Sequence, residues 1–154
     1  MAAHAVPVTL SGATISICAT LPATYDAAGY GATGLTYTAI GNVEDHGSHG
    51  VTAAITKFTP CDTAVVTKVK GSKDYGTKSI KIANIAGDAG QVILKAASES
   101  TAHYSILVTY PDSEKHYMDV LVGKYEYSDG TVDSVRIINC SLELCRAPVI
   151  VAAT

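Results

Sequence analysis

Alternating apolar and polar residues predict two β-strands in the stretch from residue 64 to residue 85. Val65, Thr67 and Val69 share one face of the first run, and lysines stand on its other face. A period of two residues is typical of strands that bury one face. Residues 71–76 separate the two runs, begin and end with glycine, and carry turn-forming residues. The pattern therefore predicts a hairpin over residues 64–85 with its tip at residues 71–76.

A single helix is expected after the second run. Asp88 is a residue type that caps helices, and Gln91 stands three positions later, as in a capping box. Apolar residues then recur at helical spacing, at Ala89, Val92, Ile93, Ala96 and Ala97. These positions predict a helix over about residues 88–98 whose apolar stripe packs on a sheet.

Six more segments show strand-like alternation. They are residues 13–19, 35–43, 51–58, 103–110, 115–122 and 133–146. In the last segment, Ile138, Cys140, Leu142 and Leu144 share one face. Many strands, one helix and no regular alternation between them are typical of mainly β folds. We expect an antiparallel β-sandwich or barrel of about seven to eight strands with one flanking α-helix.

Length and composition fit a single domain, residues 1–154. The chain has 154 residues, of which 47% are hydrophobic and 16% charged, which is enough to bury a core. We interpret residues 1–12 as a mobile N-terminal arm, because Pro7 interrupts any strand there. No apolar run reaches the roughly 18 residues of a membrane helix, and the N-terminus lacks the basic region of a signal peptide. We therefore expect a soluble chain made in the cytoplasm.

Charge is unevenly distributed, although the net charge is only −3. Residues 57–81 carry six lysines and two aspartates, a net charge of +4. Residues 99–133 carry seven acidic residues and two lysines, a net charge of −5. One interpretation is that the basic hairpin meets a complementary surface on a partner or on another copy. The other is that it is simply a solvated hairpin.

Residues with catalytic or metal-binding chemistry are few. The four cysteines are Cys18, Cys61, Cys140 and Cys145; they lack C-x-x-C spacing, which favours free, mostly buried thiols. His46 and His49 offer two metal ligands without a third nearby, which favours an exposed polar loop. His103 and His116 stand at the ends of consecutive strands, where a meeting across the hairpin is one reading and separate strand-end histidines the other.

No motif of a known catalytic class is present: there is no G-x-S-x-G, H-E-x-x-H or P-loop. Two arginines and an acidic balance also argue against nucleic-acid binding, which needs clustered cations. We predict no catalytic residue, no metal and no cofactor, and a structural role in an assembly.

The hairpin and helix carry a specific order of residues. Residues 70–76 (KGSKDYG) are followed by residues 88–91 (DAGQ) and by Leu94, Ala96 and Ala97. The supporting segments are residues 36–44, 58–60, 104–108 and 142–144. This ordered set, over residues 20–147, resembles the tail tube (major tail) proteins of long-tailed, siphovirus-type bacteriophages.

The resemblance implies a structural protein with the tail-tube fold. Members of that family form sixfold rings that stack into the tube through which DNA is ejected. It further implies a virion protein that assembles in the host cytoplasm and meets tail terminator, tail tip and tape measure proteins. DNA would pass through the lumen without specific binding, and no membrane is involved. Some relatives carry a C-terminal immunoglobulin-like domain, which we do not expect in this chain.

The resemblance and the charge pattern together point to an inter-ring interface at the predicted hairpin tip. Its residues are Lys68, Lys70, Gly71, Ser72, Lys73, Asp74 and Gly76. We expect the isolated chain to be monomeric, or partly disordered in its arm and hairpin, before assembly. Two alternatives stay open: a related secretion-system or tail-completion tube protein, and a monomeric β-sandwich binding module.

Overall fold

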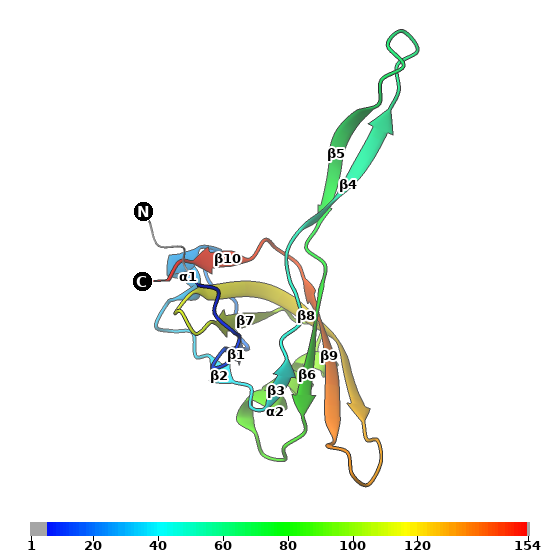
Figure 1. Cartoon of the computed structure of the whole chain (residues 1–154). Coiled ribbons are helices and arrows are strands. Elements are labelled where there is room, and N and C mark those ends of the chain that lie inside the picture. Colours follow the sequence, from blue (N-terminus) through cyan, green and yellow to red (C-terminus); the bar gives the residue numbers. More distant parts are fainter. Residues whose placement is uncertain (1–5, 154) are drawn as a thin grey trace.

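The computed structural model describes residues 6–153 as a curled antiparallel sheet with a long hairpin projecting from it (Figure 1). The sheet strands are β1 (Thr14–Cys18), β2 (Thr38–Ala39), β3 (Val43–Asp45), β6 (Thr77–Ala83), β7 (Tyr104–Thr109), β8 (Lys115–Ser128), β9 (Ile137–Leu144) and β10 (Val149–Val151). Their order is β2-β1-β7-β8-β9-β6-β3, and β10 also pairs with β8. The mainly β, antiparallel fold class is therefore confirmed.

Four elements lie outside this sheet. Strands β4 (Thr52–Phe58) and β5 (Thr67–Asp74) form the separate two-stranded hairpin, and α1 (Ala27–Tyr30) and α2 (Ala89–Glu99) are the helices. The predicted helix is confirmed as α2, whereas α1 was expected to be loop. Asp26 caps α1, since its Oδ1 accepts a hydrogen bond of 2.7 Å from the Gly29 amide. No helix among the described residues is long and apolar enough to span a membrane.

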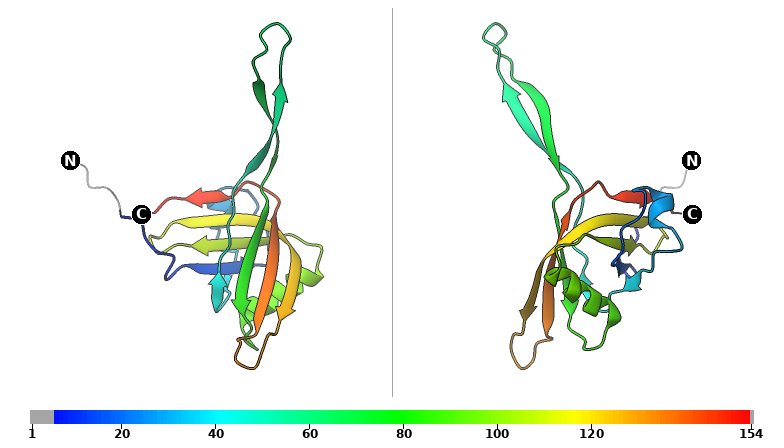
Figure 2. Two further views of the ribbon diagram at one scale, coloured as in Figure 1. Left: turned by 45° about the vertical axis from the view of Figure 1, so that its right-hand side comes forward. Right: turned by 180° about the vertical axis from the view of Figure 1, so that it is seen from behind.

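The sheet curls at β8, its longest strand. Val120 pairs with Tyr104 of β7 on one side and with Leu144 of β9 on the other. The register with β9 shifts between Val122 and Lys124, and a bulge of this kind bends a strand and increases its twist. β8 thus runs from one half of the sheet into the other, as both views in Figure 2 show.

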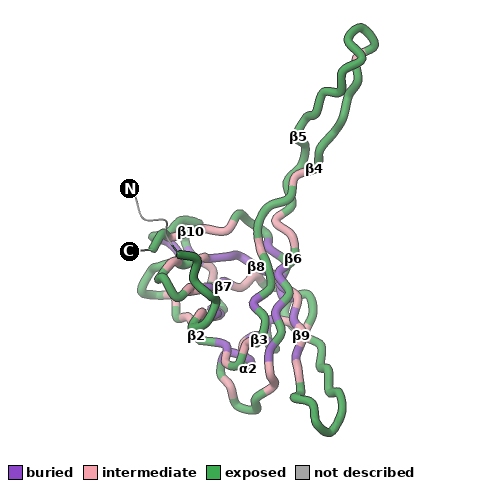
Figure 3. Tube along the Cα trace, viewed as in Figure 1, coloured by how far each residue is buried: buried purple, intermediate pink, exposed green. Residues whose placement is uncertain are grey.

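The core fills the inner face of the curl, and Figure 3 shows where the buried positions lie. Alternate residues of each strand enter it, as the period of two predicts. It contains Ile15, Ile17, Ile40, Ile80, Ile82, Leu94, Ala97, Ile106, Val108, Met118, Val120, Val122, Ile138, Cys140, Leu142 and Leu144. The predicted apolar face of the last strand is confirmed, because all four of its residues are buried.

Helix α2 closes this core, but it faces the sheet through other residues than predicted. The buried positions of the helix are Gly90, Gln91, Leu94 and Ala97, whereas Val92 is 60% exposed. Gly90 lies so close to β2 that a Cβ there would come within 2.2 Å of the Ala39 carbonyl oxygen. This close approach fixes the rotation of the helix, so the predicted stripe is only partly correct.

The predicted capping box is wrong. Asp88 is the N-cap residue, but its carboxylate makes no capping bond and instead accepts a 2.8 Å hydrogen bond from the Gly41 amide. The Gln91 side chain accepts from the Ile85 amide and donates to the carbonyl oxygens of Gly41 and Ala83. Both side chains therefore fasten the helix to neighbouring segments instead of satisfying its own first turn.

The strand pairing predicted for residues 64–85 is also wrong. β5 pairs with β4, which precedes it, whereas β6 pairs with β9 and β3 in the curled sheet. The pairing of β6 with β9 buries Ile80 opposite Cys140 and Ile82 opposite Ile138, a gain in apolar burial that a local hairpin does not offer. Residues 71–76 are consequently the base of the projecting hairpin and not its tip.

Two further segments differ in smaller ways from prediction. The segment 35–43 forms only β2 and part of β3, because Asn42 adopts a positive φ of 55° between them. β10 was not among the predicted strands, the last of which was expected over residues 133–146; it pairs with the first residues of β8. Residues 6–12 are exposed and outside regular secondary structure; the rest of the predicted arm, residues 1–5, lies outside the described residues.

Candidate assembly interface

The projecting hairpin is the most exposed element of the described chain (Figure 3). Every residue of β5 is exposed, and in β4 all residues but Ala53 are exposed. Only β4 and β5 pair with each other, so both outer edges of this ribbon are open within the described residues. An isolated two-stranded ribbon is marginally stable in water, and open edges invite pairing with another chain. The hairpin therefore has the properties of a contact surface.

One face of the hairpin collects four lysines. Residues directly opposite each other in an antiparallel pair lie on the same face, and the register pairs Lys57 with Lys68, Ile55 with Lys70, and Ala53 with Lys73. We call Lys57, Lys68, Lys70 and Lys73 the lysine face. Like charges directly opposite each other destabilise a ribbon, and none of these lysines has an ion-pair partner within residues 6–153. The lysine face thus lacks the anions that would balance it.

The other face of the hairpin carries no lysine and presents exposed apolar side chains beside threonines. Thr56 pairs with Val69 and Phe58 pairs with Thr67, and we call these four residues the apolar face. Phe58 is 63% exposed and Val69 is 56% exposed. Val65 and Val66 extend the exposed apolar surface into the connection between the strands. Exposed apolar side chains gathered on one element mark an interaction surface.

The root of the hairpin is tied to the sheet by a chain of polar side chains. The Lys78 Nζ lies 3.3 Å from the His49 Nδ1, the His49 Nε2 lies 2.7 Å from the His116 Nδ1, and the His116 Nε2 lies 2.5 Å from the Glu114 Oε1. A protonated lysine only donates and an ionised carboxylate only accepts. The hydrogen bonds therefore all run from Lys78 toward Glu114. In this arrangement both imidazoles are neutral and each donates through its Nε2.

Burial sets the proton affinities in this chain of side chains. Lys78 is 1% exposed, and burial lowers its pKa to about 8 although Asp45 acts in the opposite direction. Burial, with Lys78 and His116 nearby, lowers the pKa of His49 to about 4. The same cause lowers the pKa of His46 in the same loop. At neutral pH the root therefore holds neutral histidines beside a buried ammonium group.

Acidic residues gather at the end of the molecule opposite the hairpin. The loop between β8 and β9 lies there in all three ribbon views (Figure 1 and Figure 2). It follows Glu126 and contains Asp129 and Asp133, and we call these three residues the acidic end. Glu126 pairs with Lys124 at 3.3 Å and Asp129 pairs with Arg136 at 3.5 Å. Exposed pairs of this kind are weak, so the carboxylates can exchange partners at little cost.

The predicted interface residues all lie in β5 or directly after it. Lys68, Lys70 and Lys73 belong to the lysine face, while Gly71 and Ser72 lie at the register shift opposite Ala54. The Asp74 carboxylate accepts a 3.0 Å hydrogen bond from the Gly76 amide, and the φ of Gly76 is +73°. These last two residues direct the chain from the hairpin into β6, so they shape its base.

Sequence reasoning missed the β4 half of this surface. Ile55, Lys57 and Phe58 complete the two faces, and the signal for them was present in the strand-like alternation of residues 51–58. That segment was predicted as a strand, but its partner was not identified.

His103 and His116 do not meet across their hairpin, so the reading of separate strand-end histidines holds. His116 meets His49 and not His103, whose Nδ1 lies instead 2.8 Å from the Asp119 Oδ1. His46 is buried, with no hydrogen-bond partner for its Nδ1 among the described residues. The four cysteines are free thiols, as predicted; Cys18 and Cys140 are buried, and Cys61 and Cys145 are exposed.

No family model matches the chain, and no curated protein matches it. Solved structures do match it. A chain of the cryo-EM structure of the anti-feeding prophage baseplate, symmetrised sixfold, has a TM-score of 0.71 and 9% identity over 96% of this chain and 97% of that chain. A chain of the sheath/tube terminator of the extracellular contractile injection system PVC has a TM-score of 0.71 and 7% identity, over 97% of this chain and 100% of that chain.

A third match comes from the tail tube of SPP1. It has a TM-score of 0.62 and 15% identity, over 94% of this chain and 78% of that chain. Sequence identities this low show the fold and nothing more. The chain has the tail-tube fold, shared with the SPP1 tail tube protein and with chains of two contractile injection systems.

Proposed function

We propose that this chain is a structural subunit of a bacteriophage tail tube. Six copies form a ring, and rings stack into the conduit through which DNA is ejected. The observation that carries the proposal is the unpartnered hairpin, which projects from a domain of tail-tube fold and exposes a lysine face and an apolar face. In an assembled tube the hairpin docks on a neighbouring copy, which covers its open edges.

Charge placement supports stacking from ring to ring. Head-to-tail contacts join two different patches and propagate into a filament. The lysine face and the acidic end lie at opposite ends of one chain, so each copy can offer one to the copy above and the other to the copy below. Opposite charges of this kind favour the correct pairing and speed its formation.

The charge balance also suits a DNA conduit. Six copies carry a net charge of −18, six times the −3 of one chain. Phosphates would be held by clustered cations in a lumen, and the lysine face is engaged by neighbouring copies in the proposed tube. DNA then slides through without specific binding. The other partners are the tail terminator, tail tip and tape measure proteins, in a virion assembled in the host cytoplasm, with no membrane involved and no enzymatic activity.

A second candidate is a tail-completion protein that caps a tube. This chain matches one from a sheath/tube terminator over 97% of its own length and all of the other chain. A terminator forms a single ring and stops growth, whereas a tube subunit polymerises. The number of stacked rings formed by purified chain separates the two functions.

Charge reversal with rescue tests the proposed stacking contact. Lys68, Lys70 and Lys73 changed to Glu should block tube growth, whereas the control triple Lys81, Lys95 and Lys115 changed to Glu should not. Changing Glu126, Asp129 and Asp133 to Lys in the chain with the reversed hairpin should restore growth, because each reversed hairpin then meets a reversed acidic end. If the variant with only the three hairpin lysines reversed forms tubes of normal length in electron micrographs, the proposed contact is refuted.

A further inference from the structure

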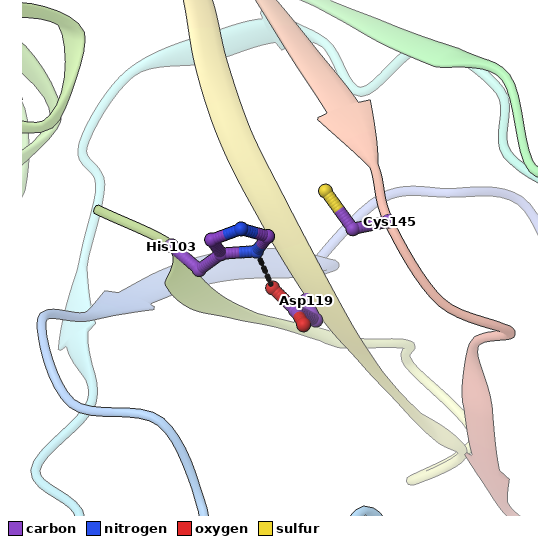
Figure 4. A group of neighbouring side chains, drawn as sticks. All are labelled: His103, Asp119 and Cys145. Carbon is purple, nitrogen blue, oxygen red and sulfur yellow. Dashed lines mark hydrogen bonds and ion pairs between the residues drawn. The ribbon is translucent and has the colours of Figure 1, made fainter. Parts of the chain in front are cut away.

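Three metal-ligand side chains converge at a site away from the hairpin. A ring nitrogen of His103, a carboxylate oxygen of Asp119 and the Sγ of Cys145 lie within 4.8 Å of one another. Figure 4 shows the three side chains reaching into one space from different segments. His103 immediately precedes β7, Asp119 lies in β8, and Cys145 immediately follows β9. Three neighbouring strands therefore bring imidazole, carboxylate and thiol together.

We propose that His103, Asp119 and Cys145 form a binding site for a zinc ion, with water as the fourth ligand. Nitrogen, sulfur and carboxylate oxygen are the ligands that zinc takes, usually four in a tetrahedron. With ordinary zinc bond lengths, ligand atoms in such a tetrahedron stand roughly 3.3–3.6 Å apart. Here the His103 Nδ1 and the Asp119 Oδ1 are 2.8 Å apart, and all three ligand atoms lie within 4.8 Å of one another, so side-chain movements are needed to complete the tetrahedron.

The two carboxylate oxygens of Asp119 make different contacts. Oδ1 lies 2.8 Å from the His103 Nδ1 and faces the site, whereas Oδ2 accepts a 3.2 Å hydrogen bond from the Arg146 Nε. The Asp119 side chain is only 2% exposed, so it is held in one orientation. A metal-ligating carboxylate that is fixed by a second hydrogen bond is a common feature of protein metal sites. Oδ1 thus remains free to exchange its hydrogen bond for a metal bond.

The arginine near the site contacts an aromatic ring as well as the Asp119 carboxylate. The Arg146 guanidinium carbon lies 3.8 Å from the centre of the Tyr25 ring, an arrangement that stabilises a cation over an aromatic face. Its charge is shared between that ring and Oδ2. It orients Asp119 through Oδ2, which is not the oxygen that contacts His103.

The site is open to ions and water on one side. A hollow of about 390 Å³ is lined by Leu21, Tyr25, His103, Asp119, Cys145 and Arg146. The Cys145 amide donates a 2.9 Å hydrogen bond to the Asp119 carbonyl oxygen, which fixes the thiol beside β8. Binding replaces the thiol proton, which passes to solvent, and frees the His103 Nδ1 to coordinate while its Nε2 carries the ring proton.

A metal ion bound at this site links three strands next to the hairpin root. Cys145 directly follows Leu144, whose amide donates a 3.0 Å hydrogen bond to the Gly76 carbonyl oxygen at the base of the hairpin. A metal ion at this site therefore joins the start of β7 and the interior of β8 to the end of β9, beside the base of the hairpin. Because the ion binds only the folded chain, it raises the thermal unfolding midpoint.

Titration of the reduced, full-length chain with Co²⁺ and then Zn²⁺ tests the site. We expect one Co²⁺ per chain with a Kd below about 10 µM, a thiolate-to-cobalt charge-transfer band, and displacement of the cobalt by Zn²⁺. Cys145→Ser should abolish the band, and His103→Gln should weaken binding at least about 10-fold. Cys61→Ser, which removes an exposed thiol elsewhere, should leave both unchanged.

Two results would overturn the site. One is a chain that binds no cobalt at this affinity while its unfolding transition shows it to be folded. The other is a charge-transfer band that persists in Cys145→Ser or disappears in Cys61→Ser, which would place the metal on another thiol. Zinc that raises the unfolding midpoint of the unmodified chain, but not that of Cys145→Ser, supports the site by a readout independent of cobalt spectra.

Discussion

The Lys78 ammonium lies 3.3 Å from the His49 Nδ1 beneath the root of the projecting hairpin. Lys78 belongs to β6 in the curled sheet, and His49 belongs to the loop that leads into β4. Their contact therefore joins the core of the domain to the element proposed for assembly. A buried charge of this kind is costly, and its position at the root suggests that it orients the hairpin.

Replacing Lys78 with Met should stabilise the isolated chain. Lys78 is 1% exposed, and burial lowers its pKa to about 8, so the folded state holds a charge in an unfavourable place. Removing it should raise the free energy of unfolding at pH 7 by about 1–3 kcal/mol, measured by urea denaturation. Lys81→Met, on the exposed face of the same strand, should change it by less than about 0.5 kcal/mol. A loss of stability in Lys78→Met would contradict this account.

Stability should fall as the pH drops from about 6.5 to about 4, because of His49. Its pKa is lowered to about 4 in the folded chain, so in this window the unfolded chain binds the additional proton and gains stability from it. The contribution is intact above pH 6.5 and is lost as pH falls toward 4. In His49→Gln, the slope of unfolding free energy against pH should be smaller across this window. An unchanged slope would show that His49 is not responsible.

Removing the Gln91 amide should destabilise the domain strongly. Gln91 is 3% exposed and bonds to the Ile85 amide and to two carbonyl oxygens. Gln91→Leu keeps the bulk of the side chain but leaves these backbone groups buried and unpaired, at a cost of about 2–4 kcal/mol. Lys95→Leu, an exposed position on the same helix, is the control and should stay within about 0.5 kcal/mol. Equal thermal midpoints for the two variants would contradict the assigned role.

Substitutions on the apolar face should separate assembly from folding. Phe58 and Val69 are mostly exposed in the single chain, so Phe58→Ser with Val69→Ser should leave the unfolding transition of the curled sheet within about 0.5 kcal/mol. Tube growth, followed by light scattering, should be lost, because the apolar face then has no surface to bury against a neighbour. Growth at the normal rate would show that this face stays in solvent.

Local alternation predicted the strands well because it reports burial one residue at a time. Ile138 and Leu142 were predicted on one face and are both buried in the core. The helix was predicted for a similar reason, from spacing within a few turns. Alternation does not name the partner of a strand, and β6 pairs with β9 because that pairing buries Ile80 and Ile82.

Other features depend on contacts across the chain. Gly76 was interpreted as the end of a turn, but its positive φ directs the chain from the ribbon into the sheet. Gln91 matched a capping box, but its amide reaches Gly41, which is 50 residues away in sequence. The two-residue period of a strand is enough to place Lys78 on the same face as Ile80 and Ile82. A lysine on an apolar face was thus the one available signal for the buried polar contact at the hairpin root.

The central claim is that this chain builds a tube through its hairpin, and electron microscopy of the purified chain tests it most directly. The unmodified chain at high concentration should form hollow rings with sixfold symmetry and stacks of them. A variant in which residues 52–74 are replaced by a short glycine-serine link should keep a cooperative unfolding transition and form no stacks. An unmodified chain that remains monomeric, or a hairpin-deleted chain that still stacks into tubes, would contradict the claim.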